Sequence, residues 1–101
     1  HGSEMNSYFT VIVNFETMPD EQSRALELIG SYVGTFLSQQ PGFISGRLHG
    51  SIDGKRIVNY AQWESEEHFK AFADKASSHP DLPEIRKYKP EAGFFEVWKQ
   101  Y

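Results

Sequence analysis

The 101-residue sequence contains no cysteine. Disulfides, thiolate nucleophiles and zinc or iron–sulfur sites with thiolate ligands are therefore excluded. The sequence also lacks any apolar run that approaches the ~20 residues of a membrane-spanning helix. No basic segment leading into an apolar stretch is visible near the start, as a secretory signal requires. We therefore expect a cytoplasmic protein that does not bind membranes.

Positive charge is also scarce. Ten Lys and Arg residues stand against 14 Asp and Glu residues, which gives a net charge of −4 and a pI of about 5.5. Binding of nucleic-acid phosphates requires clustered Lys and Arg, so we expect no nucleic-acid partner. The stretch HGSE at residues 1–4, before Met5, is typical of an expression-vector remnant. The length then predicts a single domain over residues 5–101.

Aromatic residues are abundant, at 15% of the chain. Eight Phe, five Tyr and two Trp in one small domain indicate either a densely aromatic core or an aromatic-lined pocket and interface. Composition alone leaves both alternatives open.

Strand-like and helix-like patterns alternate along the chain. Apolar residues at helical spacing predict a helix of about five turns that has Pro19 in its first turn. A second helix is predicted to begin after Ser65, which suits an N-cap. The connection over 77–93 is long and contains one predicted helical turn at 83–88. Runs of β-branched and aromatic residues predict strands over 8–15, 43–50, 56–63 and 94–101.

The predicted element order is β-α-β-β-α-β, which indicates an α+β fold. In the ferredoxin-like arrangement of this order, both helices cover one face of a four-stranded antiparallel sheet. The other face should then be polar, yet it would carry Val58 and Tyr60 from the third strand. The simplest explanation is a homodimer in which a second copy covers this face. The alternative is a monomer with an unusually apolar surface.

The third strand places an amide among apolar residues. Ile57, Asn59, Ala61 and Trp63 share one face, which we assign to the helix side because Trp63 leads directly into the second helix. A buried amide without a partner costs about 1–3 kcal/mol. Asn59 therefore needs a backbone group, a water or a ligand. The pattern predicts either an apolar cavity with two neutral hydrogen-bonding groups or an ordinary core in which the backbone satisfies Asn59.

The stretch PGFISGRLHGSIDGKRIVNYAQWESEEHFKAF, residues 41–72, resembles the antibiotic biosynthesis monooxygenase domain family. The PGF turn, the hairpin after it, and a strand NYxxW that leads into S-x-E-x-F carry the resemblance, which extends over the chain from about residue 7. The family consists of dimeric α+β barrels, in which two ferredoxin-like sheets pack face to face. The resemblance therefore implies a homodimer through the sheet face.

The resemblance also implies an activity, which is cofactor-independent oxidation of an electron-rich aromatic by dioxygen. Anthrones and hydroquinones of polyketide or quinone metabolism are the expected substrates, with no metal or cofactor. Asn59 and Trp63 match the family positions that hydrogen-bond the substrate or its oxygen adduct. Phe69 stands where the best-studied members have a tyrosine, so a hydroxyl is missing. The expected substrate-binding residues are His68, Phe69, Phe72 and Arg86.

Three alternatives compete with this interpretation. Haem-degrading relatives have a second Trp and an axial His at the positions of Phe72 and Leu82, and His79 is offset from the latter. A metal site built from His49, His68 and His79 lacks a ligand spacing typical of metal sites. The third alternative is a non-catalytic dimeric module that binds a small molecule or has a structural role.

Overall fold

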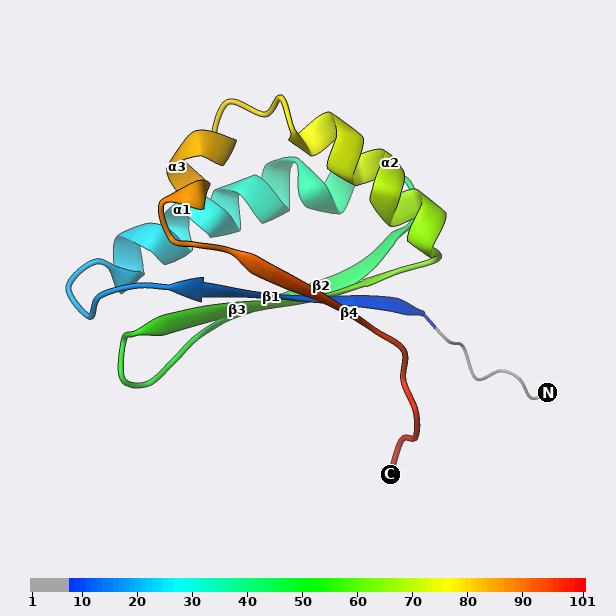
Figure 1. Ribbon diagram of the computed structural model, residues 1–101, viewed down its shortest axis with the longest axis horizontal. Helices are drawn as coiled ribbons and strands as arrows, with labels where there is room; N and C mark the ends of the chain where they lie inside the picture. The colour runs from blue at the N-terminus through cyan, green and yellow to red at the C-terminus, as the bar shows by residue number, and fades with distance from the viewer. Residues whose placement is uncertain (1–7) are drawn as a thin grey trace.

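The structure is a computed structural model that describes residues 8–101, so the expected vector remnant at residues 1–4 lies outside the described residues. A four-stranded sheet is covered by helices on one face (Figure 1). No helix within residues 8–101 has the length and apolar character needed to cross a membrane. The elements are β1 Phe9–Glu16, α1 Gln22–Thr35, η2 Leu37–Gln39, β2 Phe43–Gly50, β3 Arg56–Trp63, α2 Glu66–Ala76, α3 Leu82–Arg86 and β4 Glu91–Phe95.

The strand order across the sheet is β2-β3-β1-β4, and every neighbouring pair is antiparallel. The helices α1, α2 and α3 all lie on the same side of this sheet (Figure 1). The predicted ferredoxin-like α+β fold is therefore confirmed. The opposite face of the sheet carries no helix of the described chain, and the homodimer across it stays a prediction.

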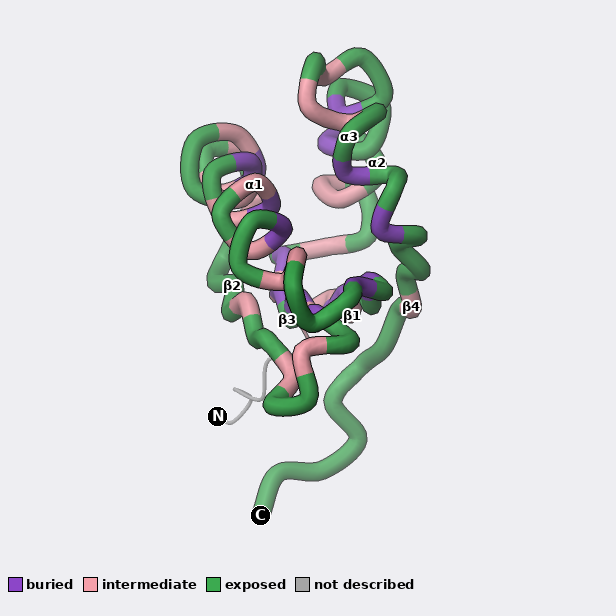
Figure 2. Tube along the Cα trace, turned by 90° about the vertical axis from the view of Figure 1, so that its left-hand side faces the viewer, coloured by how far each residue is buried: buried purple, intermediate pink, exposed green. Residues whose placement is uncertain are grey.

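The core lies between the sheet and the helices (Figure 2). On β3, burial alternates residue by residue, and the four residues assigned to the helix side are all buried. They pack against the buried faces of α1 and α2. The period-two pattern of β3 thus correctly predicted which of its side chains enter the core. The buried residues of these three elements are Ile57, Asn59, Ala61 and Trp63 of β3, Ala25, Ile29 and Tyr32 of α1, and Phe72 and Ala76 of α2.

The start of α1 differs from the prediction, because Pro19 lies in a turn before the helix rather than in its first turn. The β2–β3 hairpin fixes this start. The side-chain amide of Gln22 donates to the backbone carbonyls of Ser51 and Arg56, both at 3.0 Å. Pro19 instead packs against Gly54 at the hairpin tip. Tertiary contacts that the local sequence does not encode therefore move the helix boundary.

The fourth strand also differs from the prediction. It was expected over 94–101, but β4 spans Glu91–Phe95. Its partner β1 starts at Phe9, and the last residue pair of the register is Thr10 with Phe95. The segment Glu96–Tyr101 therefore leaves the sheet and runs to the side away from the helices (Figures 1 and 2). The strand-like composition of this tail reflects exposed apolar residues, not a place in this sheet.

Substitution of Gly42 or of Gly34 by alanine should change the free energy of unfolding in opposite directions. Gly42 has φ +86°, and a Cβ added to it would lie 2.3 Å from Cγ of His68. Gly34 lies in the last turn of α1 with no heavy atom within 4 Å of an added Cβ. We expect Gly42→Ala to lower the free energy of unfolding by about 1–3 kcal/mol through strain and collision. Gly34→Ala should raise it by about 0.5–1 kcal/mol.

Urea denaturation of both variants measures these changes. A Gly42→Ala variant as stable as the wild type would contradict the described turn between η2 and β2, because that turn requires a left-handed residue against α2.

Candidate active site

A cavity of about 150 Å³ lies between the helix-facing side of the sheet and the helices. Its walls come from β1, α1, η2, β3, α2 and α3 together with Pro90, and most of the side chains are aliphatic or aromatic. No charged residue lines it. The three lining residues that carry a polar side-chain atom are Tyr32, Asn59 and Trp63.

Asn59 has a buried carboxamide whose oxygen lacks a partner. The residue is 5% exposed, and Oδ1 forms no hydrogen bond with the described residues. Across the sheet, its neighbours are Val13 of β1 and Leu48 of β2, neither of which has a side-chain donor. The backbone therefore does not satisfy this oxygen. An acceptor left in this state calls for a donor from a guest molecule or a water.

Trp63 and two phenylalanines form an aromatic wall of the cavity. Trp63 is fully buried. Its ring lies 5.7 Å from Phe69 in an edge-to-face arrangement and 5.2 Å from Phe72, centroid to centroid. Phe69 and Phe72, both predicted to bind substrate, thus line the same cavity as Asn59 and Trp63. Such a wall suits a flat aromatic guest.

Tyr32 also lines the cavity, although no sequence motif predicted it as a site residue. It comes from α1, on the opposite wall from the sheet. Burial raises the pKa of Tyr32 to about 12. Its phenol therefore stays protonated at neutral pH and remains a hydrogen-bond donor. The available signal was its position three residues after Ile29, which places both on the buried face of α1.

The structure does not bring His68 and Arg86 to the cavity. Nδ1 of His68 lies 2.8 Å from Oγ of Ser65 at the start of α2, and its ring packs against Gly42. Arg86 is exposed at the end of α3. Neither residue lines the cavity. The substrate contact predicted for His68 therefore rests only on its place in the first turn of α2, and that of Arg86 only on the family resemblance.

The histidines considered as metal ligands lie on separate elements. His49 is on β2, His68 is on α2 and His79 follows α2. Nδ1 of His79 accepts a hydrogen bond from the backbone N–H of Asp81 at 3.0 Å. Within residues 8–101, no three His, Asp or Glu side chains gather in a way that would hold a metal ion.

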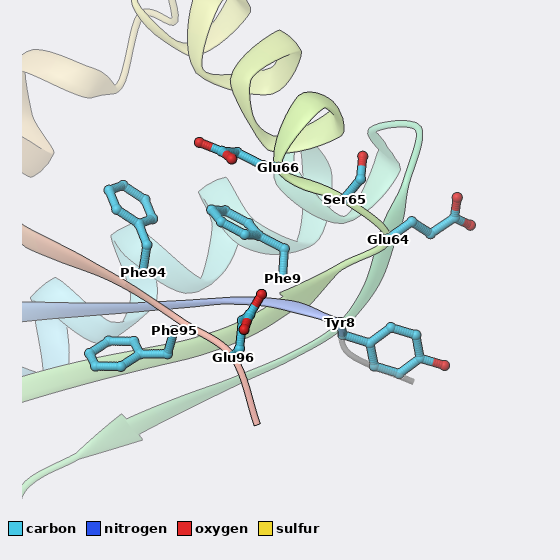
Figure 3. Close-up of a pocket in the computed structure, with 8 residues that line it drawn as sticks. All are labelled: Tyr8, Phe9, Glu64, Ser65, Glu66, Phe94, Phe95 and Glu96. Carbon is cyan, nitrogen blue, oxygen red and sulfur yellow. The ribbon is translucent and has the colours of Figure 1, made fainter. Parts of the chain in front are cut away.

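A second, more open pocket of about 370 Å³ lies at the ends of β1 and β4, beside the start of α2 (Figure 3). Phe9 and Phe94 line it and sit between the sheet and α2. The ring centroid of Phe69 lies 5.8 Å from that of Phe9 and 5.5 Å from that of Phe94. Phe69 is thus in the partition between the inner cavity and this outer pocket.

The volume of the inner cavity limits the size of the guest that fits without movement of its walls. A cavity of about 150 Å³ accommodates a guest the size of benzene. A guest with three fused rings has to displace part of the wall. Phe69 is the side chain whose movement would join the inner cavity to the outer pocket.

Comparison with known proteins shows which family the chain belongs to. Residues 8–80 match the family model described as "Antibiotic biosynthesis monooxygenase". This chain belongs to the antibiotic biosynthesis monooxygenase family. It is 32% identical over 90 residues to the tetracenomycin-F1 monooxygenase of Streptomyces glaucescens, and the match covers 88% of this chain and 80% of that protein.

Solved structures agree with this membership. The monooxygenase from the gene ActVA-Orf6 of Streptomyces coelicolor, solved in complex with nanaomycin D, is 31% identical with a TM-score of 0.77. The alignment covers 95% of this chain and 92% of that one. SnoaB of Streptomyces nogalater, a cofactor-independent oxygenase, has a TM-score of 0.75 at 21% identity over 93% of this chain and 96% of that one. At that identity it shows the shared fold alone.

The unpaired oxygen of Asn59 predicts an unusual effect on stability. Asn59→Leu keeps the approximate side-chain volume and removes the buried acceptor, so it should raise the free energy of unfolding by about 1–3 kcal/mol. Glu27 of α1 is the control, because it is exposed and lines neither the cavity nor the helix-free face of the sheet. Glu27→Leu should change stability by no more than about 0.5 kcal/mol.

Chemical denaturation of the two variants and the wild type measures the difference. A clear loss of stability in Asn59→Leu would mean that the carboxamide has a structural partner.

Proposed function

We propose that this chain is a cofactor-independent monooxygenase that oxidises an electron-rich aromatic with dioxygen in polyketide or quinone metabolism. The observation that carries the proposal is the buried, unpaired carboxamide oxygen of Asn59 in an uncharged aromatic cavity. The similarity to two monooxygenases at 31–32% identity supports it, and one of those enzymes was solved with the aromatic ligand nanaomycin D. An anthrone- or hydroquinone-like compound is the substrate class.

The reaction can be balanced without an external reductant. An anthrone in its enolate form transfers an electron to dioxygen, and the carbon opposite the carbonyl then forms a C–O bond, giving a peroxide anion. A proton converts this anion to the hydroperoxide. Loss of the remaining C–H proton and cleavage of the O–O bond then yield a quinone carbonyl and water. The two electrons that reduce the second oxygen atom come from the substrate carbon.

The cavity supplies what such a reaction needs from a protein. The carboxamide of Asn59 has both an acceptor and donors, so it can bind the substrate oxygen as a hydroxyl and, after the amide turns, as an oxyanion. The aromatic wall around Trp63 holds the ring system and excludes water from the peroxide. A three-ring substrate would reach past Phe69 into the outer pocket.

Oxygen consumption tests the proposed activity. Metal-free wild-type protein in excess chelator should consume dioxygen with anthrone above the buffer rate and form anthraquinone. Asn59→Ala should lower this rate by about 100-fold or more, because loss of one positioned group at a developing oxyanion has an effect of that order. Glu27→Ala is the control, because Glu27 is exposed on α1 and does not line the cavity, and it should keep the wild-type rate.

An oxygen electrode with product analysis records both results. Full turnover by Asn59→Ala would remove the amide from the mechanism. Saturable binding of anthrone without oxygen uptake by the wild type would instead identify the non-catalytic binding module.

We also propose that the protein is a homodimer through the sheet face without helices. Ile12 and Val58 are only half-buried on this face, and Tyr60 is 37% exposed. The tail Glu96–Tyr101 runs to the same side, with Trp98 87% exposed. Six extended residues reach roughly 20 Å. A second copy packed on this face would cover these apolar groups.

A single charge on this face tests the dimer. Wild-type protein should have twice the 11.6 kDa chain mass by light scattering. Tyr60→Glu should be monomeric because it places an unpaired charge in the interface. Ala73→Glu is the control on the exposed side of α2 and should stay dimeric. A wild type that is monomeric at every concentration would rule out this interface.

A further inference from the structure

The cavity has acceptor and donor groups on opposite walls. Asn59 lines it from β3 with an unpaired acceptor oxygen, and Tyr32 lines it from α1. No lining residue carries a charge. A phenolic guest that forms an oxyanion here would have no cation beside it, so neutral donors must stabilise the anion.

The ring of Tyr32 is held by its neighbours while its hydroxyl is not engaged. The ring packs edge-to-face on His79 at 4.9 Å and against Phe36 at 5.5 Å, centroid to centroid. The side chain is only 8% exposed. Among the hydrogen bonds within residues 8–101, none involves the Tyr32 hydroxyl. The phenol therefore has a fixed position and an uncommitted donor.

We propose that Tyr32 contacts the substrate directly, donating a hydrogen bond from its hydroxyl to the phenolic oxygen of the guest. When that oxygen is protonated, its own O–H donates to Oδ1 of Asn59. The guest oxygen thus sits between a donor on α1 and an acceptor on β3. The assignment of an aromatic hydroxyl compound as the guest rests on the proposed function.

In this proposal, Tyr32 supplies the hydroxyl that Phe69 lacks. Phe69 offers an aromatic ring and no hydroxyl, so the phenol reaches the cavity from α1 instead of α2. The raised pKa of Tyr32, about 12, keeps its proton on while the guest ionises. A donor that stays protonated stabilises the guest oxyanion and lowers the pKa of the bound guest.

The test uses 4-nitrophenol, whose anion absorbs visible light, so its ionisation can be followed when it is bound. Spectrophotometric titration with wild type, Tyr32→Phe and Tyr88→Phe gives the pKa of the bound probe in each. Tyr88 is the matched control, because it is also 8% exposed and does not line the cavity. We expect Tyr32→Phe to raise the bound pKa by about one unit, which is a tenfold smaller ratio of anion to neutral probe at a given pH. Tyr88→Phe should leave it unchanged.

Binding of 4-nitrotoluene separates hydrogen bonding from shape, because a methyl group replaces the phenolic oxygen and can neither accept a hydrogen bond nor ionise. Its affinity should be the same in wild type and Tyr32→Phe. Equal bound pKa values in all three proteins overturn the proposal, as does an equal loss of affinity for both probes in Tyr32→Phe. Absence of saturable 4-nitrophenol binding to wild type also overturns it. If Tyr32→Phe fails to fold, Tyr32→Leu is titrated instead, with the same expected rise.

The outcome is separable from that of the proposed function. A wild type that consumes no dioxygen with anthrone, yet shows the Tyr32-dependent pKa shift, rejects the oxygenase and retains the contact. An active wild type with no such shift rejects the contact alone.

Discussion

The unpaired carboxamide oxygen of Asn59 is the constraint on which the rest of the structure depends. It lies in the middle of β3, where both neighbouring strands present aliphatic side chains. Burial of such an acceptor costs about 1–3 kcal/mol, a large share of the stability of a small domain. The fold retains it in a cavity that no charged side chain enters. That combination is typical of a binding site and uncommon in a core selected for stability alone.

The remaining elements serve this cavity in different ways. Pairing of β3 on both sides fixes the backbone of Asn59, so the amide cannot move away from the apolar walls. The helices α1 and α2 close the cavity, where α1 supplies Tyr32 and α2 brings Phe72 against Trp63. The opposite face of the sheet is left free for another role, which we propose is contact with a second copy. Under these two proposals, chemistry and assembly use opposite faces of one sheet.

Local patterns in the sequence were sufficient where the structure is itself local. The alternation around Asn59 and Trp63 predicted the buried face of β3, and Ser65 predicted the start of α2, where its side chain accepts from the backbone N–H of His68. The end of β4 could not be predicted, because the start of β1 limits the pairing. Tyr32 was missed because an aromatic on an apolar helix stripe looks like core until the opposite wall is known.

The most direct measurement is the NMR signal of the Asn59 side-chain carboxamide during titration with phenol and, separately, with toluene. The two guests have similar size and differ in the hydroxyl. If the orphan oxygen receives the guest hydroxyl, saturation with phenol moves the Asn59 carboxamide resonance strongly, and saturation with toluene leaves it near its starting position. The account is contradicted if both guests bind within the cavity and the Asn59 resonance responds to neither.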